Sequence, residues 1–341
     1  MGGGIIGLSL SIELRKRGLK VLIVERGEPG REASHAAAGM LADCGSELPP
    51  ELRSLATASA RMYPEFVHEL QDESEVNVDL RDRGTILLHE SSPAGLSMPL
   101  SELEPAVVGA GLSASYLKER SVDPRALAAA ALKAAKHRGV DIASGTAVTE
   151  IRAADGHATG VKTEKSSYSA PVVVNCGGAW AGQFSPCAVP TRPVKGQILS
   201  VVGGPALQHV VRAPEVYLVP RGDGRIVIGA TAEDAGYDKR TEPETIQRLH
   251  HAAVRLAPAL GNARIHEAWA GLRPGTPDGL PILGETSVRG YFAATGHFRD
   301  GILLAPVTAS VMAGLITENR PGFDLSAFSP ERFQSEVRRA G

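Results

Sequence analysis

The first hydrophobic pattern along the chain is helical. Ile6, Leu10 and Leu14 recur at every fourth position with apolar residues beside them, and Gly18 follows. This spacing predicts an inward-facing helix of about 13 residues that ends at the glycine. The unbroken apolar run at 21–24 then predicts a strand buried on both faces.

Three further helices and several strands are predicted along the chain. Apolar residues in helical spacing mark residues 51–72, and Asp123-Pro124 provides an N-cap and an N1 proline for a helix that runs to about His137. An apolar helix is expected from Ile302 to about Ile316. Strands are expected at 78–89, 140–142, 147–152, 158–163, 172–175 and 291–296.

Residues 190–275 have a hydrophobic period closer to two. Residues 216–221 and 225–230 alternate around a Gly-Asp-Gly turn at 222–224 and predict a hairpin. This stretch therefore indicates a second, mostly antiparallel domain.

The N-terminal helix begins in a G-x-G-x-x-G loop formed by Gly2, Gly4 and Gly7. Such glycines let the backbone turn tightly and approach a pyrophosphate at the positive end of a helix. Glu25 follows eighteen residues after Gly7, where a carboxylate can accept both ribose hydroxyls. These features predict a dinucleotide-binding βαβ unit. Only Met1 precedes the loop, so we expect the first strand of that unit to be missing from this chain.

Composition narrows the classes of partner. The net charge is −2 and no apolar run reaches membrane-spanning length, so neither nucleic acid nor a membrane is expected. Three scattered cysteines, Cys44, Cys176 and Cys187, favour a reducing, cytoplasmic location without disulfides. The histidines at 250, 251 and 266 lack ligand partners at metal spacing, so no metal site is predicted.

Six motifs carry a family resemblance. They lie at residues 2–7, 36–41, 121–125, 193–197, 269–279 and 296–306. These motifs resemble the FAD-dependent glycine oxidases of thiamine biosynthesis, within the D-amino-acid oxidase and sarcosine oxidase group. The resemblance implies non-covalent FAD and oxidation of glycine, other small amines or D-amino acids to imines, with hydrogen peroxide formed from O2. It also implies a homo-oligomer, a tetramer in several members.

The resemblance also implies a fold and its division. We expect an α/β protein with a Rossmann-like FAD-binding domain of the glutathione-reductase type and a mostly antiparallel substrate domain. The FAD-binding domain would be discontinuous and comprise residues 1–45, 120–185 and 280–325. The substrate domain would comprise residues 46–119 and 186–279.

Site residues follow from the matching positions. The implied cofactor contacts are Gly2, Gly4, Ile5, Ile6, Gly7, Glu25, Arg26, Ala33, Ser34, Ala38, Gly39, Met40, Val148, Gly177, Gly271, His297, Phe298, Arg299, Asp300, Gly301, Ile302 and Leu303. The chain departs from the family at Glu215 and Ala232, both on the expected substrate side, where His and Met are frequent.

Flavin-dependent amine oxidation moves a hydride from Cα to N5 of the flavin and needs an anchor for the substrate carboxylate. Arg273 is the first candidate because a guanidinium binds both carboxylate oxygens, and Arg299 is the second. Tyr217 could donate a phenolic hydrogen bond. The helix expected to begin near Asp300 could hold negative charge at the flavin N1–O2 edge. No general base is required if the amine arrives neutral.

Two other functions remain open from the sequence. One is a flavin-dependent dehydrogenase of D-amino acids or N-methyl amines that uses an acceptor other than oxygen. The other, from a different class, is a non-catalytic FAD-binding subunit of a larger assembly.

Overall fold

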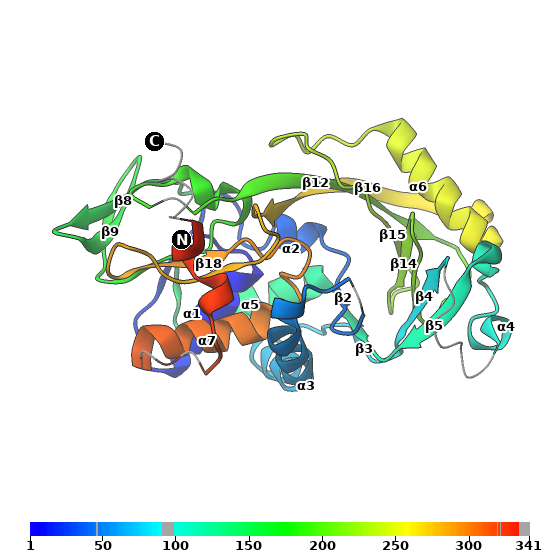
Figure 1. Cartoon of the computed structure of the whole chain (residues 1–341), viewed down its shortest axis with the longest axis horizontal. Helices are drawn as coiled ribbons and strands as arrows, with labels where there is room; N and C mark the ends of the chain where they lie inside the picture. The colour runs from blue at the N-terminus through cyan, green and yellow to red at the C-terminus, as the bar shows by residue number, and fades with distance from the viewer. Residues whose placement is uncertain (46, 91–98, 188, 319, 321, 334–341) are drawn as a thin grey trace.

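The computed structural model describes residues 1–45, 47–90, 99–187, 189–318, 320 and 322–333 (Figure 1). The α-helices are α1 Ile5–Lys16, α2 Ala33–Ala36, α3 Arg53–Ser74, α4 Leu100–Leu103, α5 Pro124–His137, α6 Pro243–Leu256 and α7 Ala305–Glu318. The 3-10 helices are η1 Pro50–Leu52, η2 Gly109–Gly111, η3 Gly178–Gln183, η4 Pro258–Asn262, η5 Ser326–Phe328 and η6 Pro330–Phe333. The strands are β1 Leu22–Val24, β2 Met40–Leu41, β3 Leu80–Arg81, β4 Thr85–His89, β5 Ser113–Leu117, β6 Arg120–Val122, β7 Asp141–Ala143, β8 Val148–Ala154, β9 His157–Thr163, β10 Ser167–Ser169, β11 Val173–Asn175, β12 Arg192–Val202, β13 Val210–Arg212, β14 Tyr217–Pro220, β15 Ile226–Gly229, β16 Arg264–Gly275, β17 Ile282–Glu285 and β18 Tyr291–Thr295.

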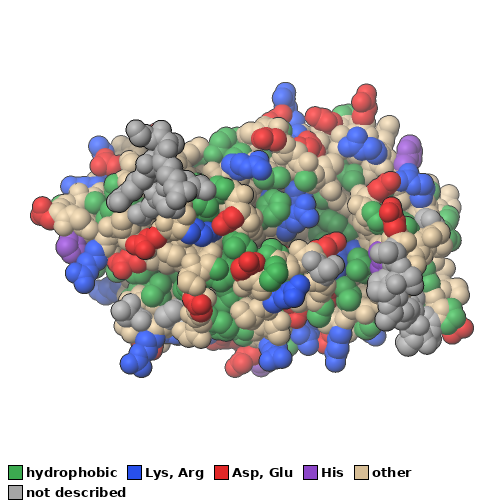
Figure 2. Space-filling model, viewed as in Figure 1, with side chains coloured by type: hydrophobic (Ala, Val, Ile, Leu, Met, Phe, Trp, Pro, Cys, Tyr) green, Lys and Arg blue, Asp and Glu red, His purple; other side chains and the backbone are tan. Residues whose placement is uncertain are grey.

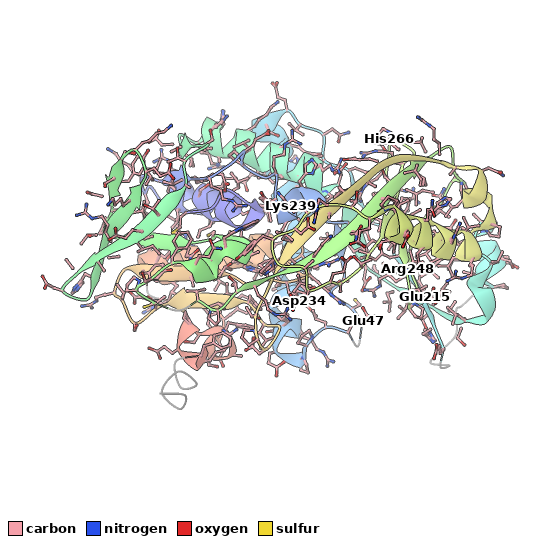
Figure 3. All side chains as sticks on the ribbon, turned by 90° about the horizontal axis from the view of Figure 1, so that it is seen from above. Glu47, Glu215, Asp234, Lys239, Arg248 and His266 are labelled. Atoms are coloured by element: carbon pink, nitrogen blue, oxygen red, sulfur yellow. The ribbon has the colours of Figure 1, made fainter. Side chains whose placement is uncertain are left out.

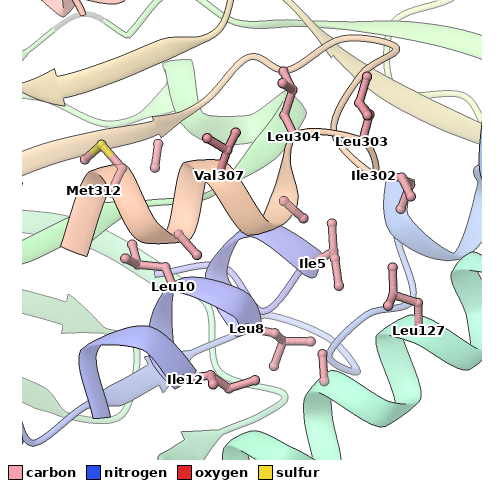
Figure 4. Close-up of a cluster of buried hydrophobic side chains, with 14 of the residues drawn as sticks. Ile5, Leu8, Leu10, Ile12, Leu127, Ile302, Leu303, Leu304, Val307 and Met312 are labelled. Carbon is pink, nitrogen blue, oxygen red and sulfur yellow. The ribbon is translucent and has the colours of Figure 1, made fainter. Parts of the chain in front are cut away.

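Helices α1, α3, α5 and α7 pack together into one hydrophobic core. Figure 4 shows Leu8 and Leu10 of α1 in this cluster with Leu127 of α5 and Val307 of α7. The predicted N-terminal helix is confirmed, but its burial does not follow the predicted spacing, because Ile6 is only half-buried and residues 7–12 are all buried. Asp123 caps α5 as predicted, because its side chain accepts hydrogen bonds from the first-turn amides.

Short parallel strand pairs lie beside this helical layer. Strand β1 pairs with β7, and β11 pairs with β18. Met1 and Gly2 join the two pairs, because Gly2 N–H donates to Val24 O at 2.9 Å and Cys176 N–H donates to Met1 O at 2.8 Å. The α1 N-terminus therefore lies at the carboxyl ends of β1 and β11. Leu22 is 37% exposed, so the expectation of a strand buried on both faces is wrong at that residue.

The largest sheet in the described part of the chain has seven strands, in the order β16-β12-β15-β14-β13-β4-β5. Only the β13–β4 pair in it is parallel, so the predicted antiparallel character is confirmed. The long strands β12 and β16 extend from this sheet toward the helical layer (Figure 1). They thereby connect two halves of the molecule: the half with the helical layer and the parallel strand pairs, and the half with the seven-stranded sheet.

Two predictions within these halves need correction. Helix α6 interrupts the stretch to which we assigned a period of two, and it packs on the sheet with Ile246, Leu249 and Leu256 buried. The last helix begins at Ala305, not near residue 300 or 302. Pro306 explains the later start, since in a helix from Ile302 its ring would meet the Ile302 carbonyl.

The division into two domains stays a prediction. Residue 46, where one boundary was placed, lies outside the described residues. Charged side chains of both signs are mixed over the face seen in Figure 2, in keeping with the net charge of −2. No helix among the described residues is long and apolar enough to cross a membrane.

Candidate active site

One cavity of about 970 Å³ extends from the glycine loop to the seven-stranded sheet. Among the described residues, all predicted site residues line it except Gly7 and Leu303. Leu303 is 1% exposed in the hydrophobic core, and its carbonyl accepts a hydrogen bond from Ser59 Oγ. Its side chain therefore packs in the core and does not face the cavity, and its assignment as a cofactor contact stays a prediction.

The glycine loop is close-packed. Gly2 has φ +96°, and a Cβ there would lie 2.3 Å from Cys176 O. A Cβ on Gly7 would lie 2.1 Å from Gly2 O. Gly7 therefore lets α1 pack against the loop instead of lining the cavity, and it leaves the backbone of Gly4 free to face the cavity.

Glu25 lies beneath this loop and is 9% exposed. Its Oε2 accepts from Gly3 N–H at 2.7 Å, and its Oε1 accepts from Gly27 N–H at 2.8 Å. An ionised carboxylate has about four acceptor sites, so it can also accept hydroxyl groups from the cavity side. Ser34 Oγ accepts from Ile5 N–H at 2.9 Å and fixes the start of α1.

Aromatic and charged side chains cover the same end of the cavity. The Arg26 guanidinium lies 3.4 Å from the centroid of the Trp180 ring, and Trp180 stacks on Tyr237. Lys239 Nζ lies 3.1 Å from both oxygens of Glu32, and Figure 3 shows Lys239 beside α2. The loop after β15 is therefore tied to the segments around Arg26 and Glu32. Sequence reasoning missed Trp180 and Tyr237, which only the three-dimensional packing brings together.

Residues 36–40 all line the cavity and are called the cavity-facing segment below. A Cβ on Gly271 of β16 would lie 2.4 Å from the Ala36 Cβ, so this glycine lets β16 approach the segment. Gly39 has φ +75°, and a Cβ there would lie 1.9 Å from Val122 O. The two glycines therefore let the segment pack closely against β16 on one side and β6 on the other.

Arg273 and Tyr217 meet across the sheet at the other end of the cavity. Each side chain crosses a neighbouring strand at a glycine, because a Cβ on Gly196 would lie 2.3 Å from Arg273 Nη1 and one on Gly229 would lie 2.5 Å from the Tyr217 hydroxyl. The charge of Arg273 and the phenol of Tyr217 interact electrostatically. Arg273 Nη1 also donates to Thr231 O at 2.9 Å.

Burial governs the charges of this pair. It lowers the pKa of Arg273, against the opposing effect of Tyr217, and it raises the pKa of the Tyr217 phenol, against the charge of Arg273. Tyr217 therefore stays a neutral hydrogen-bond donor. Arg299 lines the cavity as an exposed residue, with its guanidinium 5.1 Å from the centroid of the Phe298 ring.

The turn before α7 holds two groups with shifted pKa values. Burial lowers the pKa of His297 to about 3, so its imidazole is neutral, and its Nε2 lies 3.1 Å from Thr308 Oγ1. Burial raises the pKa of Asp300 to about 6, although the Arg299 charge opposes this shift. The turn at residues 297–302 lines the cavity, and the Asp300 carbonyl accepts from Leu304 N–H at 2.8 Å just before α7 begins at Ala305. The charge-holding role predicted for this helix start stays a prediction.

The two residues that depart from the family pattern, Glu215 and Ala232, lie in different places relative to the cavity. Glu215 lines the cavity, is exposed and forms an ion pair with Arg255; Figure 3 shows it near α6. Ala232 is exposed and is not among the described residues that line the cavity, so its placement at the substrate side is wrong. No group of three His, Cys, Asp or Glu side chains in the described ranges could hold a metal ion.

The cavity fits FAD at several points. Gly2 and Gly4 of the glycine loop line it, the Glu25 carboxylate beside them accepts only two backbone hydrogen bonds from the described residues, and the cavity-facing segment lines it as well. The family model described as "FAD dependent oxidoreductase" (DAO) matches residues 1–315. The chain belongs to this family. FAD is accordingly its cofactor, and the chain is a flavin-dependent oxidoreductase.

Similar proteins support the same conclusion. The chain is 34% identical to a protein named glycine oxidase from Geobacillus kaustophilus, over 99% of this chain and 97% of that one. The crystal structure of glycine oxidase from that organism superposes with a TM-score of 0.91 over 97% of each chain.

This chain is also 37% identical to a protein named bifunctional protein ThiO/ThiG from Trichormus variabilis, over 99% of this chain and 55% of the relative. The chain thus spans about half the length of such bifunctional relatives.

Proposed function

We propose that this protein oxidises glycine and similar small amines or D-amino acids with FAD and oxygen. Glycine would lose its Cα hydrogen with two electrons and a proton from nitrogen, and the resulting imine would be hydrolysed to glyoxylate and ammonia. Bound FAD supplies the two-electron acceptor, and these electrons reduce O2 to hydrogen peroxide. The relatives named glycine oxidase and ThiO support this proposal.

The Arg273–Tyr217 pair is the observation that carries the proposal. A half-buried guanidinium with a phenol beside it faces the same cavity as the nucleotide-binding loop. Such a pair can bind a carboxylate through charge-assisted hydrogen bonds. This would place Cα of an amino acid within the cavity and beside the cavity-facing segment.

The nearby charges also favour the reactive form of the amine. Arg273 and Arg299 both carry positive charge, and their mutual repulsion contributes to the lowered pKa of Arg273. The same charges would lower the pKa of a bound ammonium group and promote its deprotonation. A dedicated general base is therefore not needed in this proposal.

We further propose that FAD is held without a covalent bond. Cys44 and Cys176 line the cavity, but burial raises the pKa of each thiol to about 11. The thiolate needed for flavin attachment is therefore disfavoured at neutral pH. The three cysteines, which form no disulfide, also fit the proposed reducing, cytoplasmic location. The homotetramer stays a prediction that sedimentation can check.

The proposal is tested by adding glycine to the FAD-loaded protein without oxygen. The flavin absorption should bleach and return on admission of air, with hydrogen peroxide formed. Bleaching without rapid return would instead support a dehydrogenase, and no bleaching by small amines or D-amino acids would support a non-catalytic subunit. Arg273→Ala should retain the flavin spectrum and lower kcat/KM for glycine by roughly a hundredfold or more, comparable to the loss of a buried charge pair.

A further inference from the structure

We propose that Trp269 and Arg221 are positioning residues that hold the cavity-facing segment at a fixed distance from the carboxylate anchor. This inference rests on the function proposed above and concerns two residues that were not among the predicted site residues. Trp269 Nε1 donates to Ala36 O at 3.1 Å, and Arg221 Nη2 donates to Ala38 O at 2.6 Å. The segment is thus bonded at two of its carbonyls by side chains of the seven-stranded sheet.

Each of these donors lies on, or directly after, the strand that carries Arg273 or Tyr217. Trp269 and Arg273 both belong to β16, four positions apart. Tyr217 begins β14, and Arg221 directly follows that strand, again four positions away. Side chains an even number of residues apart lie on one face of a strand. The same two strand runs therefore set the anchor and the segment relative to each other.

The strand register ties the two runs together. Trp269 is opposite Ile198, Ile198 is opposite Gly229, and Gly229 is opposite Tyr217. Trp269 and Tyr217 consequently stand in one row across four hydrogen-bonded strands. A displacement of the β16 backbone at Trp269 would therefore distort this row.

The hydrogen bonds also orient the backbone of the segment. A trans peptide points its N–H opposite to the carbonyl that precedes it. With the Ala36 and Ala38 carbonyls turned toward Trp269 and Arg221, the amides of Ala37 and Gly39 are directed the other way. Neither donor is among the described residues that line the cavity, whereas residues 36–40 are. These two amides are thereby directed to the cavity side.

Both donors are themselves fixed. Arg221 is 6% exposed, and its Nη1 donates to Val122 O at 3.2 Å. The Arg125 guanidinium lies 4.5 Å from the centroid of the Trp269 ring and pairs with Glu267 through contacts of 2.8 and 3.2 Å. The segment is therefore held by side chains with little freedom of their own.

The test compares Trp269→Phe, which removes the indole N–H together with the five-membered ring, with Arg221→Lys, which keeps the charge. Tyr116→Phe is the matched control, because it removes a single bond from a side chain to a backbone carbonyl, at Arg83, at the far end of the same sheet. Each FAD-loaded variant is assayed for its flavin absorption spectrum, its Kd for acetate as a carboxylate probe, and its rate of anaerobic reduction at saturating glycine. The melting temperature and the FAD Kd of each apoprotein are measured alongside.

We expect Trp269→Phe to shift the flavin absorption bands and to slow reduction by about tenfold to a hundredfold, since small misplacements of reacting groups cost that much. Acetate Kd should stay within about twofold of wild type, because Arg273 and Tyr217 are untouched. Arg221→Lys should show the same pattern, and Tyr116→Phe should match wild type. If Arg221→Lys does not fold, the flavin spectrum, acetate Kd and reduction rate of Trp269→Phe alone test the proposal.

Wild-type spectrum and reduction rate in Trp269→Phe would overturn the proposal. So would an acetate Kd that rises as much as reduction slows, because the residue would then act on the anchor. If glycine fails to reduce even the wild-type flavin, the proposed function is wrong. The flavin spectra and FAD Kd values of the variants still decide whether the segment is positioned from the sheet.

Discussion

Gly196→Ala is predicted to disable the anchor while leaving the fold intact. The added Cβ would lie 2.3 Å from Nη1 and 2.6 Å from Cζ of Arg273, whereas ordinary contacts begin near 3.4 Å. The guanidinium must therefore move by about 1 Å, which is easy for the end of a flexible side chain but large for a reacting geometry. A misplacement of that size costs about a hundredfold in rate, or about 2.7 kcal/mol.

The assay is kcat/KM for glycine together with the melting temperature of the FAD-loaded protein. Gly261→Ala is the control, because its Cβ would meet only Val254 at an ordinary 3.7 Å. We expect Gly196→Ala to lose about a hundredfold in kcat/KM with little change in melting temperature, and Gly261→Ala to lose neither. Arg273→Lys should add little in the Gly196→Ala background, since both changes act on one group. Additive losses, or wild-type activity in Gly196→Ala, would refute the placement of Arg273.

Three further predictions concern the cofactor end and the turn before α7. Glu25→Ala should weaken FAD binding by about 1.5–3 kcal/mol in a fluorescence titration, the range for hydrogen bonds to a charged group; unchanged affinity would place the carboxylate outside the site. Gly7→Ala should lower both FAD content and melting temperature, because its Cβ would lie 2.1 Å from the Gly2 carbonyl and backbone must move. Asp300→Asn should stabilise the apoprotein in urea at pH 7.5 by up to about 3 kcal/mol, since a carboxyl pKa raised from 3.8 to about 6 costs stability as pH rises through that range. The gain should vanish near pH 4, and Asp238→Asn, where Arg240 lowers the pKa to about 2, should show no gain at pH 7.5.

Local signals in the sequence predicted several helices and strands correctly. The spacing of Ile6, Leu10 and Leu14 specified α1, and Asp123 with Pro124 specified the start of α5. These signals succeed because helix periodicity and capping depend on residues within a few positions of each other. The hairpin of β14 and β15 was found for the same reason, as its turn lies between its strands.

Predictions failed where one local signal was given too much weight. Helix α6 carries a proline at N1 and apolar residues at 246, 249, 253 and 256, but the surrounding strands led us to assign a single period to the region. The start of α7 was placed too early because Pro306 was not weighed against the apolar run. Both signals were present in the sequence.

The anchor geometry lies beyond any local signal. Arg273 and Tyr217 stand on strands that are not neighbours, and their side chains meet only because β12 and β15 lie between them. Each intervening strand supplies a glycine at the crossing point, Gly196 and Gly229. Neither glycine sits in a turn, so composition and periodicity give no reason to single them out. Their function depends on strand register, and register is set by side chains throughout the sheet. Substitutions at such glycines are therefore predicted to alter substrate binding without any change in the residues that contact substrate.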